Sequence, residues 1–170
     1  VVLSDGFSAS GGVLNRRIPD GVAPTGAEWR VESGLFTLTT TGETTTVISS
    51  RAVIETGVAD AQVAATVRTG SNPTGLILRS SSSSNYLRFV ISSKDWALQK
   101  TAGGSTSTLT SGKQAFAMGV DHLLVATLDG TTITLTIDGA VVKTIDVAFN
   151  ESATRHGLLS NGSGERFWDI

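Results

Sequence analysis

The sequence predicts an all-β domain built from two antiparallel sheets packed face to face. Three observations support this prediction: short runs that alternate apolar and polar residues, many β-branched residues, and turn signals at spacings of roughly 8 to 12 residues. No run shows the 3.6-residue apolar period of a long helix. Counting the runs gives about a dozen strands, for which two facing sheets are the natural arrangement.

The expected strands are separated by recognisable turns. After an opening strand at residues 4–7 and a long loop, alternating or β-branched runs occupy 29–38, 44–53, 58–68, 76–79, 86–92, 96–100, 106–110, 123–128, 132–137 and 141–147. The five serines Ser80–Ser84, followed by Asn85, predict a polar hairpin loop. The Asp-Gly pairs at 129–130 and 138–139 predict type I′ hairpin turns, in which both central residues have positive φ.

The residue pairing expected across each hairpin turn assigns side chains to the two faces of a sheet. A turn at residues 93–94 sets Val90 opposite Ala97, so the large apolar residues at 87, 89, 91, 96 and 98 share the core face. The opposite face is half polar and carries Tyr86, Arg88 and Gln99, with Arg79 joining them across the serine loop. A turn at residues 129–130 pairs Ala126 with Ile133 and directs the threonines at 132, 134 and 136 outward.

Arg79, Tyr86, Arg88 and Gln99 are candidate ligand-binding residues. Sugars are held by an aromatic face together with planar hydrogen-bonding groups, which Tyr, Arg and Gln provide. An ordinary solvated sheet face can carry the same residue types, because their stems cover apolar surface. The pattern leaves both interpretations open.

Composition and charge disfavour several classes of partner. The net charge is −2, and no basic run is longer than Arg16-Arg17, so nucleic acid is not an expected partner. No apolar segment approaches the roughly 20 residues of a membrane-spanning helix, and membrane insertion is not expected. The absence of cysteine excludes disulfides, thiolate zinc sites and a thiol nucleophile.

The carboxylates and histidines do not form an expected catalytic site. Glycanases place carboxylates so that two of them flank the glycosidic bond, yet no glutamate here has an acidic residue two positions later. His122 and His156 lack the HxH and HExxH spacings of metal sites, and we expect them at strand ends or on the surface. The sequence predicts a protein that is not an enzyme and requires no cofactor.

Calcium is the one ion for which the sequence offers candidate ligands. Asp5, Asp20 and Asp169 would be brought together if the first and last strands lay side by side, and sandwich domains use calcium to hold such loops. The alternative is that these aspartates are turn and cap residues.

Several blocks resemble the concanavalin-A-like, laminin-G-like jelly-roll domains found in phage minor tail proteins and bacterial secreted proteins. The matching blocks are Ser4-Asp5-Gly6-Phe7 with a loop to Trp29, Gly75–Arg79 with Asn85-Tyr86, residues 137–139, and Gly157-Leu158 to Phe167. The resemblance implies a jelly roll of 12 to 14 strands over residues 1–170, carbohydrate or cell-surface recognition, and in some members calcium.

The resulting hypothesis is a non-catalytic carbohydrate-binding or adhesion domain of a phage tail protein that recognises host cell-surface glycan. It would belong to a longer chain, located in a virion tail or secreted. The alternative is a structural decoration or oligomerisation module that contacts other virion subunits. Glycan hydrolysis is the third possibility, and the missing carboxylate pair argues against it.

Overall fold

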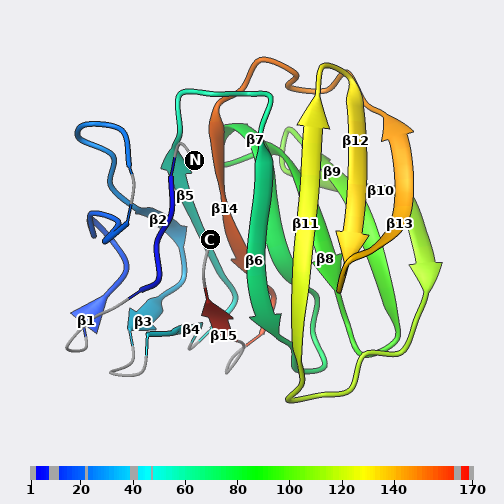
Figure 1. The fold of residues 1–170 in the computed structure, drawn as a ribbon, viewed down its shortest axis with the longest axis horizontal. Helices are drawn as coiled ribbons and strands as arrows, with labels where there is room; N and C mark the ends of the chain where they lie inside the picture. The colour runs from blue at the N-terminus through cyan, green and yellow to red at the C-terminus, as the bar shows by residue number, and fades with distance from the viewer. Residues whose placement is uncertain are drawn as a thin grey trace.

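The computed structural model describes residues 3–7, 12–21, 23–38, 42–46, 48–162 and 166–168. In these residues the chain forms fifteen strands and no helix, and the strands make two antiparallel sheets that face each other (Figure 1). The predicted two-sheet jelly-roll sandwich is confirmed. A helix able to cross a membrane is absent from the described residues.

The eight-stranded sheet, called sheet A, contains both the first and the last described strands. In spatial order its strands are β1 (Gly12–Val13), β3 (Phe36–Leu38), β4 (Thr44–Thr46), β15 (Arg166–Trp168), β6 (Gln62–Arg68), β11 (Asp121–Asp129), β12 (Thr132–Ile137) and β13 (Ala140–Asp146). The short strands β1 and β15 bring the count above the 12 to 14 expected.

The seven-stranded sheet, called sheet B, joins strands from distant parts of the chain. Its order is β10 (Ser105–Lys113), β9 (Asp95–Ala102), β8 (Asn85–Ile91), β7 (Thr74–Ser82), β14 (Arg155–Ser160), β5 (Ser50–Glu55) and β2 (Arg30–Ser33). Strand β14 therefore lies between β7 and β5 and connects the meander β7–β10 to the strands from the first third of the chain.

The core forms because each sheet turns one apolar face inward. In β6, Val63, Ala65 and Val67 are buried while the residues between them are more exposed, as the alternation of the sequence predicts. Aromatic side chains from both sheets, including Phe89 and Phe167, join the same buried cluster. The two sheets therefore share one hydrophobic core.

The hairpin registers test the assignment of faces. Val90 pairs with Ala97 as expected, and the turn at Asp138-Gly139 has positive φ at both residues. The turn between β11 and β12 differs, because Gly130 and Thr131 form it and Ala126 pairs with Leu135. A shift of the pairing by two residues preserves the side to which each residue points, so the expected faces are still correct.

The serine-rich hairpin is tighter than expected. Strand β7 continues through Ser82 and β8 begins at Asn85, so only two serines form the turn. The register between β7 and β8 shifts between Leu78 and Ser82, and Arg79 in this β-bulge has a φ of +48°. The expected five-serine loop was wrong, and the bulge redirects the side chain of Arg79.

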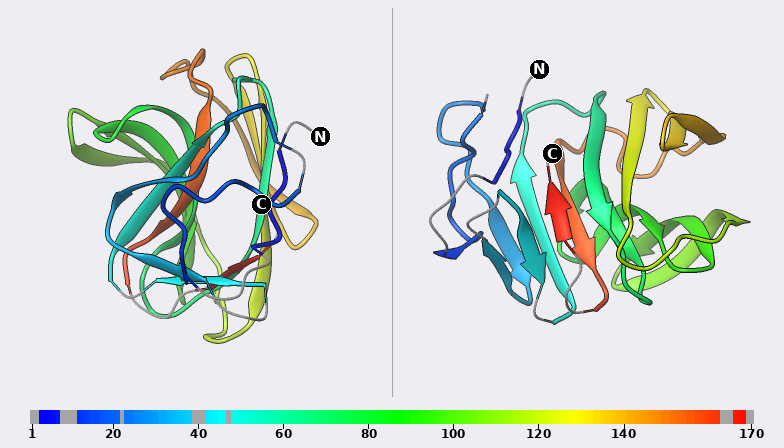
Figure 2. Two further views of the ribbon diagram at one scale, coloured as in Figure 1. Left: turned by 90° about the vertical axis from the view of Figure 1, so that its left-hand side faces the viewer. Right: turned by 60° about the horizontal axis from the view of Figure 1, so that its bottom comes forward.

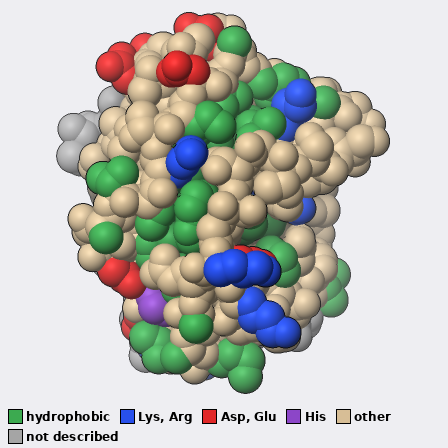
Figure 3. All heavy atoms as spheres, turned by 90° about the vertical axis from the view of Figure 1, so that its right-hand side faces the viewer, with side chains coloured by type: hydrophobic (Ala, Val, Ile, Leu, Met, Phe, Trp, Pro, Cys, Tyr) green, Lys and Arg blue, Asp and Glu red, His purple; other side chains and the backbone are tan. Residues whose placement is uncertain are grey.

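The sandwich is open along the side where β10 and β13 end the two sheets. Figure 2 shows the two layers diverging toward this side, and hydrophobic side chains are visible between them in Figure 3. Leu109, Ile145 and Phe149 pack against the core there and are only partly buried. The register of each edge strand shifts, and Lys143 of β13 pairs with the inward-facing Leu135.

Two glycines allow the central strands of sheet B to approach closely. A Cβ on Gly157 would lie 2.0 Å from the carbonyl oxygen of Ala52 in β5, and one on Gly75 would lie 2.1 Å from that of Phe89 in β8. Both obstacles are backbone atoms, which cannot rotate away. The middle of sheet B thus requires glycine at these two positions.

We expect Gly157→Ala to destabilise the fold by about 2 to 3 kcal/mol or more, because the methyl group must displace the β5 backbone. Denaturant unfolding of the purified domain measures this loss. The control is Ser111→Ala on the exposed edge strand β10, with an expected change within about 0.5 kcal/mol. Equal stability of the two variants would contradict the close approach.

Candidate functional site

The outer face of sheet B, which points away from sheet A, brings together most of the predicted binding residues. Strand register places one row of side chains straight across this face: Thr108, Gln99, Arg88, Ile77, Gly157, Val53 and Arg30. Tyr86 lies on the same face, two residues from Arg88 along β8. The expected sharing of one face by Tyr86, Arg88 and Gln99 is correct.

The floor of this face is apolar and well covered. Val53, Ile77 and Leu159 are only 0 to 3% exposed and form a cluster with Val90 and Tyr86 that is separate from the main core. The described residues form no third layer of strands over sheet B. We infer that the surrounding long side chains cover this floor. Because a shallow pocket opens beside Val53, we call this part of the face the hollow.

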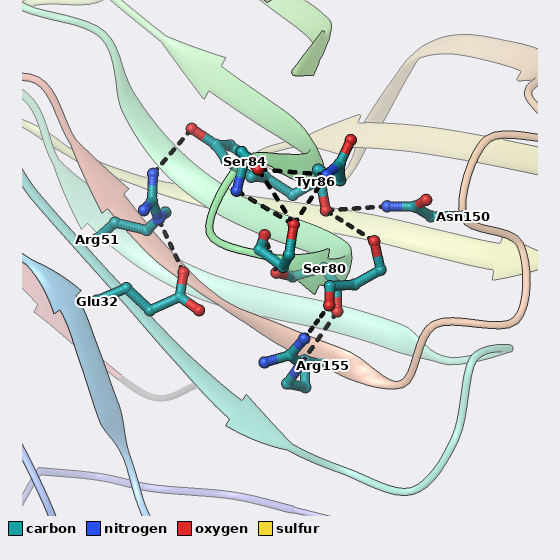
Figure 4. Close-up of polar contacts among 10 residues, drawn as sticks. Glu32, Arg51, Ser80, Ser84, Tyr86, Asn150 and Arg155 are labelled. Carbon is teal, nitrogen blue, oxygen red and sulfur yellow. Dashed lines mark hydrogen bonds and ion pairs between the residues drawn. The ribbon is translucent and has the colours of Figure 1, made fainter. Parts of the chain in front are cut away.

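Tyr86 and Arg51 meet across the middle of the hollow. Arg51 lies on β5, which β7 and β14 separate from β8. Its Nη1 nevertheless donates to the Tyr86 hydroxyl at 3.1 Å (Figure 4). Its guanidinium also lies 4.9 Å from the centre of the tyrosine ring, a cation–π contact. Glu32 of β2 accepts from the Nε of Arg51 at 2.9 Å. The ring is therefore covered by Arg51 and only 5% exposed.

Arg88 is held in place by two neutral neighbours. Its Nε donates to the Oε1 of Gln99 at 2.7 Å, and the Nε2 of Gln99 donates to the Thr108 hydroxyl at 3.1 Å. Burial lowers the pKa of Arg88, and the Tyr86 hydroxyl partly opposes that shift. The chain of hydrogen bonds orients the guanidinium, and its two terminal nitrogens have no hydrogen-bond partner among the described residues.

A shallow pocket of about 470 Å³ extends the hollow toward β2. Two arginines and two glutamates are among its lining residues, which are Gly26, Ala27, Glu28, Arg30, Val53, Glu55 and Arg155. Burial alone would raise the pKa of Glu55, but hydrogen bonds from Thr154 and Gly57 and the charge of Arg155 lower it. Arg155 is anchored by the carbonyl oxygens of Ser80 and Ser81.

The sequence did not identify Arg51, Glu32, Arg30 or Arg155 as site residues. They lie on β2, β5 and β14, which are far in sequence from the β7–β9 meander that carries the predicted residues. Only the insertion of β14 beside β7 brings the two groups together. The alternation within 44–53 places Arg51 on one face of a strand, but it does not show which strand lies beside it.

Arg79 does not belong to this face, and that prediction was wrong. Its side chain is fully buried and donates through Nη2 to Asp60 at 3.1 Å and to the carbonyl of Gly130 at 2.7 Å. Gly130 belongs to the β11–β12 turn of sheet A, so Arg79 links the two sheets. The bulge and positive φ at Arg79 turn its side chain away from the outer face.

His156 supports the same end of the sandwich. It lies near the start of β14, which agrees with the expected strand-end position, and its side chain is buried. Its Nδ1 accepts from the backbone N–H of Arg79 at 3.3 Å, and its Nε2 lies 3.1 Å from the carbonyl oxygen of Val58, to which it donates. Burial lowers its pKa. With both ring nitrogens engaged, His156 has a structural role.

The calcium candidates Asp5 and Asp20 lie together, as expected, but an arginine occupies the space between them. Arg17 pairs with Asp5 at 3.1 Å and with Asp20 at 3.0 Å. Asp5 also accepts from the indole N–H of Trp29 at 2.7 Å and from the backbone N–H of Phe7 at 2.9 Å. Burial raises the pKa of Asp5, and the hydrogen bond from Arg17 opposes that shift.

The donors around Asp5 leave little room for a calcium ion, because protein groups already satisfy its oxygens. Asp169, the third candidate ligand, lies outside the described residues. In the described part of the chain no three His, Cys, Asp or Glu side chains are grouped as metal ligands. Calcium binding at this end stays a prediction, and the geometry of Asp5 argues against it.

The fold is similar to several solved sandwich structures. The carbohydrate-binding module CBM66 from Bacillus subtilis superposes with a TM-score of 0.65 at 14% identity over 83% of this chain and 91% of that chain. The β-glucanase from Bacillus licheniformis gives 0.60 at 10% identity, with 98% and 94% covered. Sheep galectin-11 gives 0.50 at 10% identity, with 66% and 90% covered.

These similarities confirm the concanavalin-A-like jelly roll as a fold, and none of the three structures is a phage tail protein by name. At such low identity a shared sandwich shows the fold alone, and the three examples include both binding proteins and an enzyme by name. No family model matches the chain, and no curated protein sequence is significantly similar to it.

We expect Arg79→Ala to lower stability by about 2 kcal/mol or more, because it removes charged hydrogen bonds and leaves a buried cavity. The same change at Arg88, whose terminal nitrogens form no hydrogen bond within the described part of the chain, should cost less than about 1 kcal/mol. Guanidinium unfolding of both variants measures the difference. A larger loss at Arg88 than at Arg79 would contradict the placement of these two side chains.

We expect stability to fall as the pH is lowered from about 7.5 to about 5. The unfolded chain takes up a proton at His156 with the ordinary pKa of 6.5, whereas the folded chain resists protonation until a lower pH. His156→Gln should flatten this dependence. Unfolding curves at several pH values measure both slopes, and equal slopes for the parent and His156→Gln would exclude this contribution.

Proposed function

We propose that the chain is a non-catalytic carbohydrate-binding domain and that a glycan lies in the hollow outer face of sheet B. The observation that carries this proposal is the oriented Arg88. Gln99 and Thr108 fix its guanidinium at the rim of an apolar floor while its terminal nitrogens remain available. A side chain ordered before binding loses little conformational entropy when a ligand arrives.

The chemistry of the hollow suits a sugar. Sugars present several adjacent hydroxyls, and the hollow offers planar groups, Arg88 and Gln99, that can form hydrogen bonds with neighbouring oxygens. The aromatic contribution is smaller than the sequence predicts, because Arg51 covers the ring of Tyr86. The polar groups of Arg88 and Gln99 therefore provide most of the expected contact.

The absence of catalysis is supported by the outer face itself. Outside the bulged end of β7 at residues 79–82, the residues of β7, β8 and β14 that point outward are Gly75, Ile77, Tyr86, Arg88, Val90, Arg155, Gly157 and Leu159. None is a carboxylate, and a retaining glycosidase needs two carboxyl groups only about 5 to 5.5 Å apart. Glycan hydrolysis has no candidate acid and nucleophile at the centre of this face.

The setting that we propose is a phage tail or a secreted protein, where host-surface glycan would be the ligand. It is supported by the resemblance of the blocks described above. A structural or oligomerisation module is the second candidate, and one observation favours it. Met118, Val120 and Leu123, near the start of β11, and Val141, on β13, are 42 to 66% exposed. A stable oligomer without glycan affinity would favour this second candidate.

The test is binding of the domain to a glycan array that includes bacterial wall polysaccharides, followed by calorimetry on the best ligand. We expect Arg88→Ala and Gln99→Ala to weaken binding by about tenfold or more each, because each removes a charged or charge-orienting hydrogen bond. Thr144→Ala, on the outer face of sheet A, is the matched control and should bind normally. Unchanged affinity in both the Arg88 and the Gln99 variants would show that the glycan binds elsewhere on the domain.

A further inference from the structure

Arginine is concentrated on the outer face of sheet B. The chain has a net charge of −2 and nine arginines, and four of these lie on or beside this face: Arg30, Arg51, Arg88 and Arg155. Two of the four have acidic neighbours, since Arg51 pairs with Glu32 and Arg155 is paired in register with Glu55. Arg30 lines the same pocket as Glu28 and Glu55, and only Arg88 has no acidic partner among the described residues, so the four arginines outnumber the three nearby glutamates, Glu28, Glu32 and Glu55.

The charge of Arg88 is unbalanced. Its one hydrogen bond goes to the neutral Oε1 of Gln99, and among the described residues it forms no ion pair. The residue is partly buried, and burial lowers the pKa of its guanidinium, a shift that Tyr86 opposes only in part. A partly desolvated cation without a counter-charge costs free energy, which a bound anion recovers.

Arg30 is a second cation, at the opposite end of the row. It is exposed on β2 and has no hydrogen bond or ion pair within the described part of the chain. Between Arg88 and Arg30 lie Ile77, Gly157 and Val53, none of which carries charge. The two arginines are four strand spacings apart, about 19 Å on a flat sheet, which leaves room for several sugar rings between them.

We propose that the glycan bound on the outer face of sheet B is acidic, and that Arg88 receives the carboxylate of a uronic acid. This inference rests on the proposed carbohydrate-binding function. A guanidinium binds a carboxylate through two parallel N–H···O hydrogen bonds, and Gln99 already holds Nε, so Nη1 and Nη2 form the fork that is left. A neutral sugar would contact the same nitrogens through hydroxyls but would leave the charge unbalanced.

The experiment compares polymers that differ in charge. Calorimetry of the domain of residues 1–170 uses polygalacturonate, the same polymer after reduction of its carboxyl groups, and poly(glycerol phosphate). We expect polygalacturonate to bind at least about tenfold more tightly than the reduced polymer. This preference should shrink as salt rises from about 20 mM to about 500 mM, because salt screens an exposed ion pair.

Three variants test whether Arg88 causes the preference for the acidic polymer. Arg88→Gln should abolish the difference between the two forms of the polymer, and Arg88→Lys should retain only part of it, because lysine keeps the charge but lacks the fork. Lys143→Gln on β13 removes one positive charge outside this face and should leave the preference unchanged. Circular dichroism and thermal unfolding confirm that each variant is folded.

These experiments distinguish failure of the acidic-ligand inference from failure of the carbohydrate-binding proposal. Equal binding of the acid and reduced polymers, or a preference that persists in Arg88→Gln, overturns the acidic-ligand inference while the carbohydrate-binding proposal stands. Tighter binding of poly(glycerol phosphate) than of polygalacturonate overturns the assignment of a carboxylate. A domain that binds no glycan on the array or in these titrations overturns the proposed function, and the inference that rests on it.

Discussion

The insertion of β14 between β7 and β5 is the constraint on which the outer face of sheet B depends. It joins a local meander to two strands from the first third of the chain, and without it the sheet would consist of two separate pieces. The junction is tight, because Gly157 of β14 lies against the backbone of β5 and Gly75 of β7 against that of β8. Any side chain there would push the strands apart and separate Tyr86 from Arg51.

Different interactions stabilise this junction at one end and in the middle. At one end His156 and Arg79, both buried, connect β14 and β7 to Asp60 and to the β11–β12 turn of sheet A. In the middle, Arg51 bridges β5 and β8 across the outer face. One arginine is thus used to hold the sheets together and another to hold the hollow in shape, which explains why neither is as available to a ligand as Arg88.

The sequence predicted what depends on local pattern. The alternation in 86–91 and the short turn after it gave the correct face for Tyr86, Arg88 and Gln99, because a hairpin register depends only on neighbouring residues. It failed at Arg79, since a β-bulge changes the direction of one side chain without changing the alternation around it. It could not find Arg51 or Glu32, because their position near Tyr86 depends on strand order in the whole sheet.

The edge strands have a consequence for how the domain behaves at high local concentration. An unpaired edge strand can form hydrogen bonds with a strand of another molecule. Here β10 and β13 each carry a register shift, and Lys143 occupies a position on the inward side of β13. A second molecule that added its strand here would distort the ladder and bury an ammonium group. Many copies could therefore be crowded side by side, on a fibre or a cell surface, and still resist aggregation through their sheet edges.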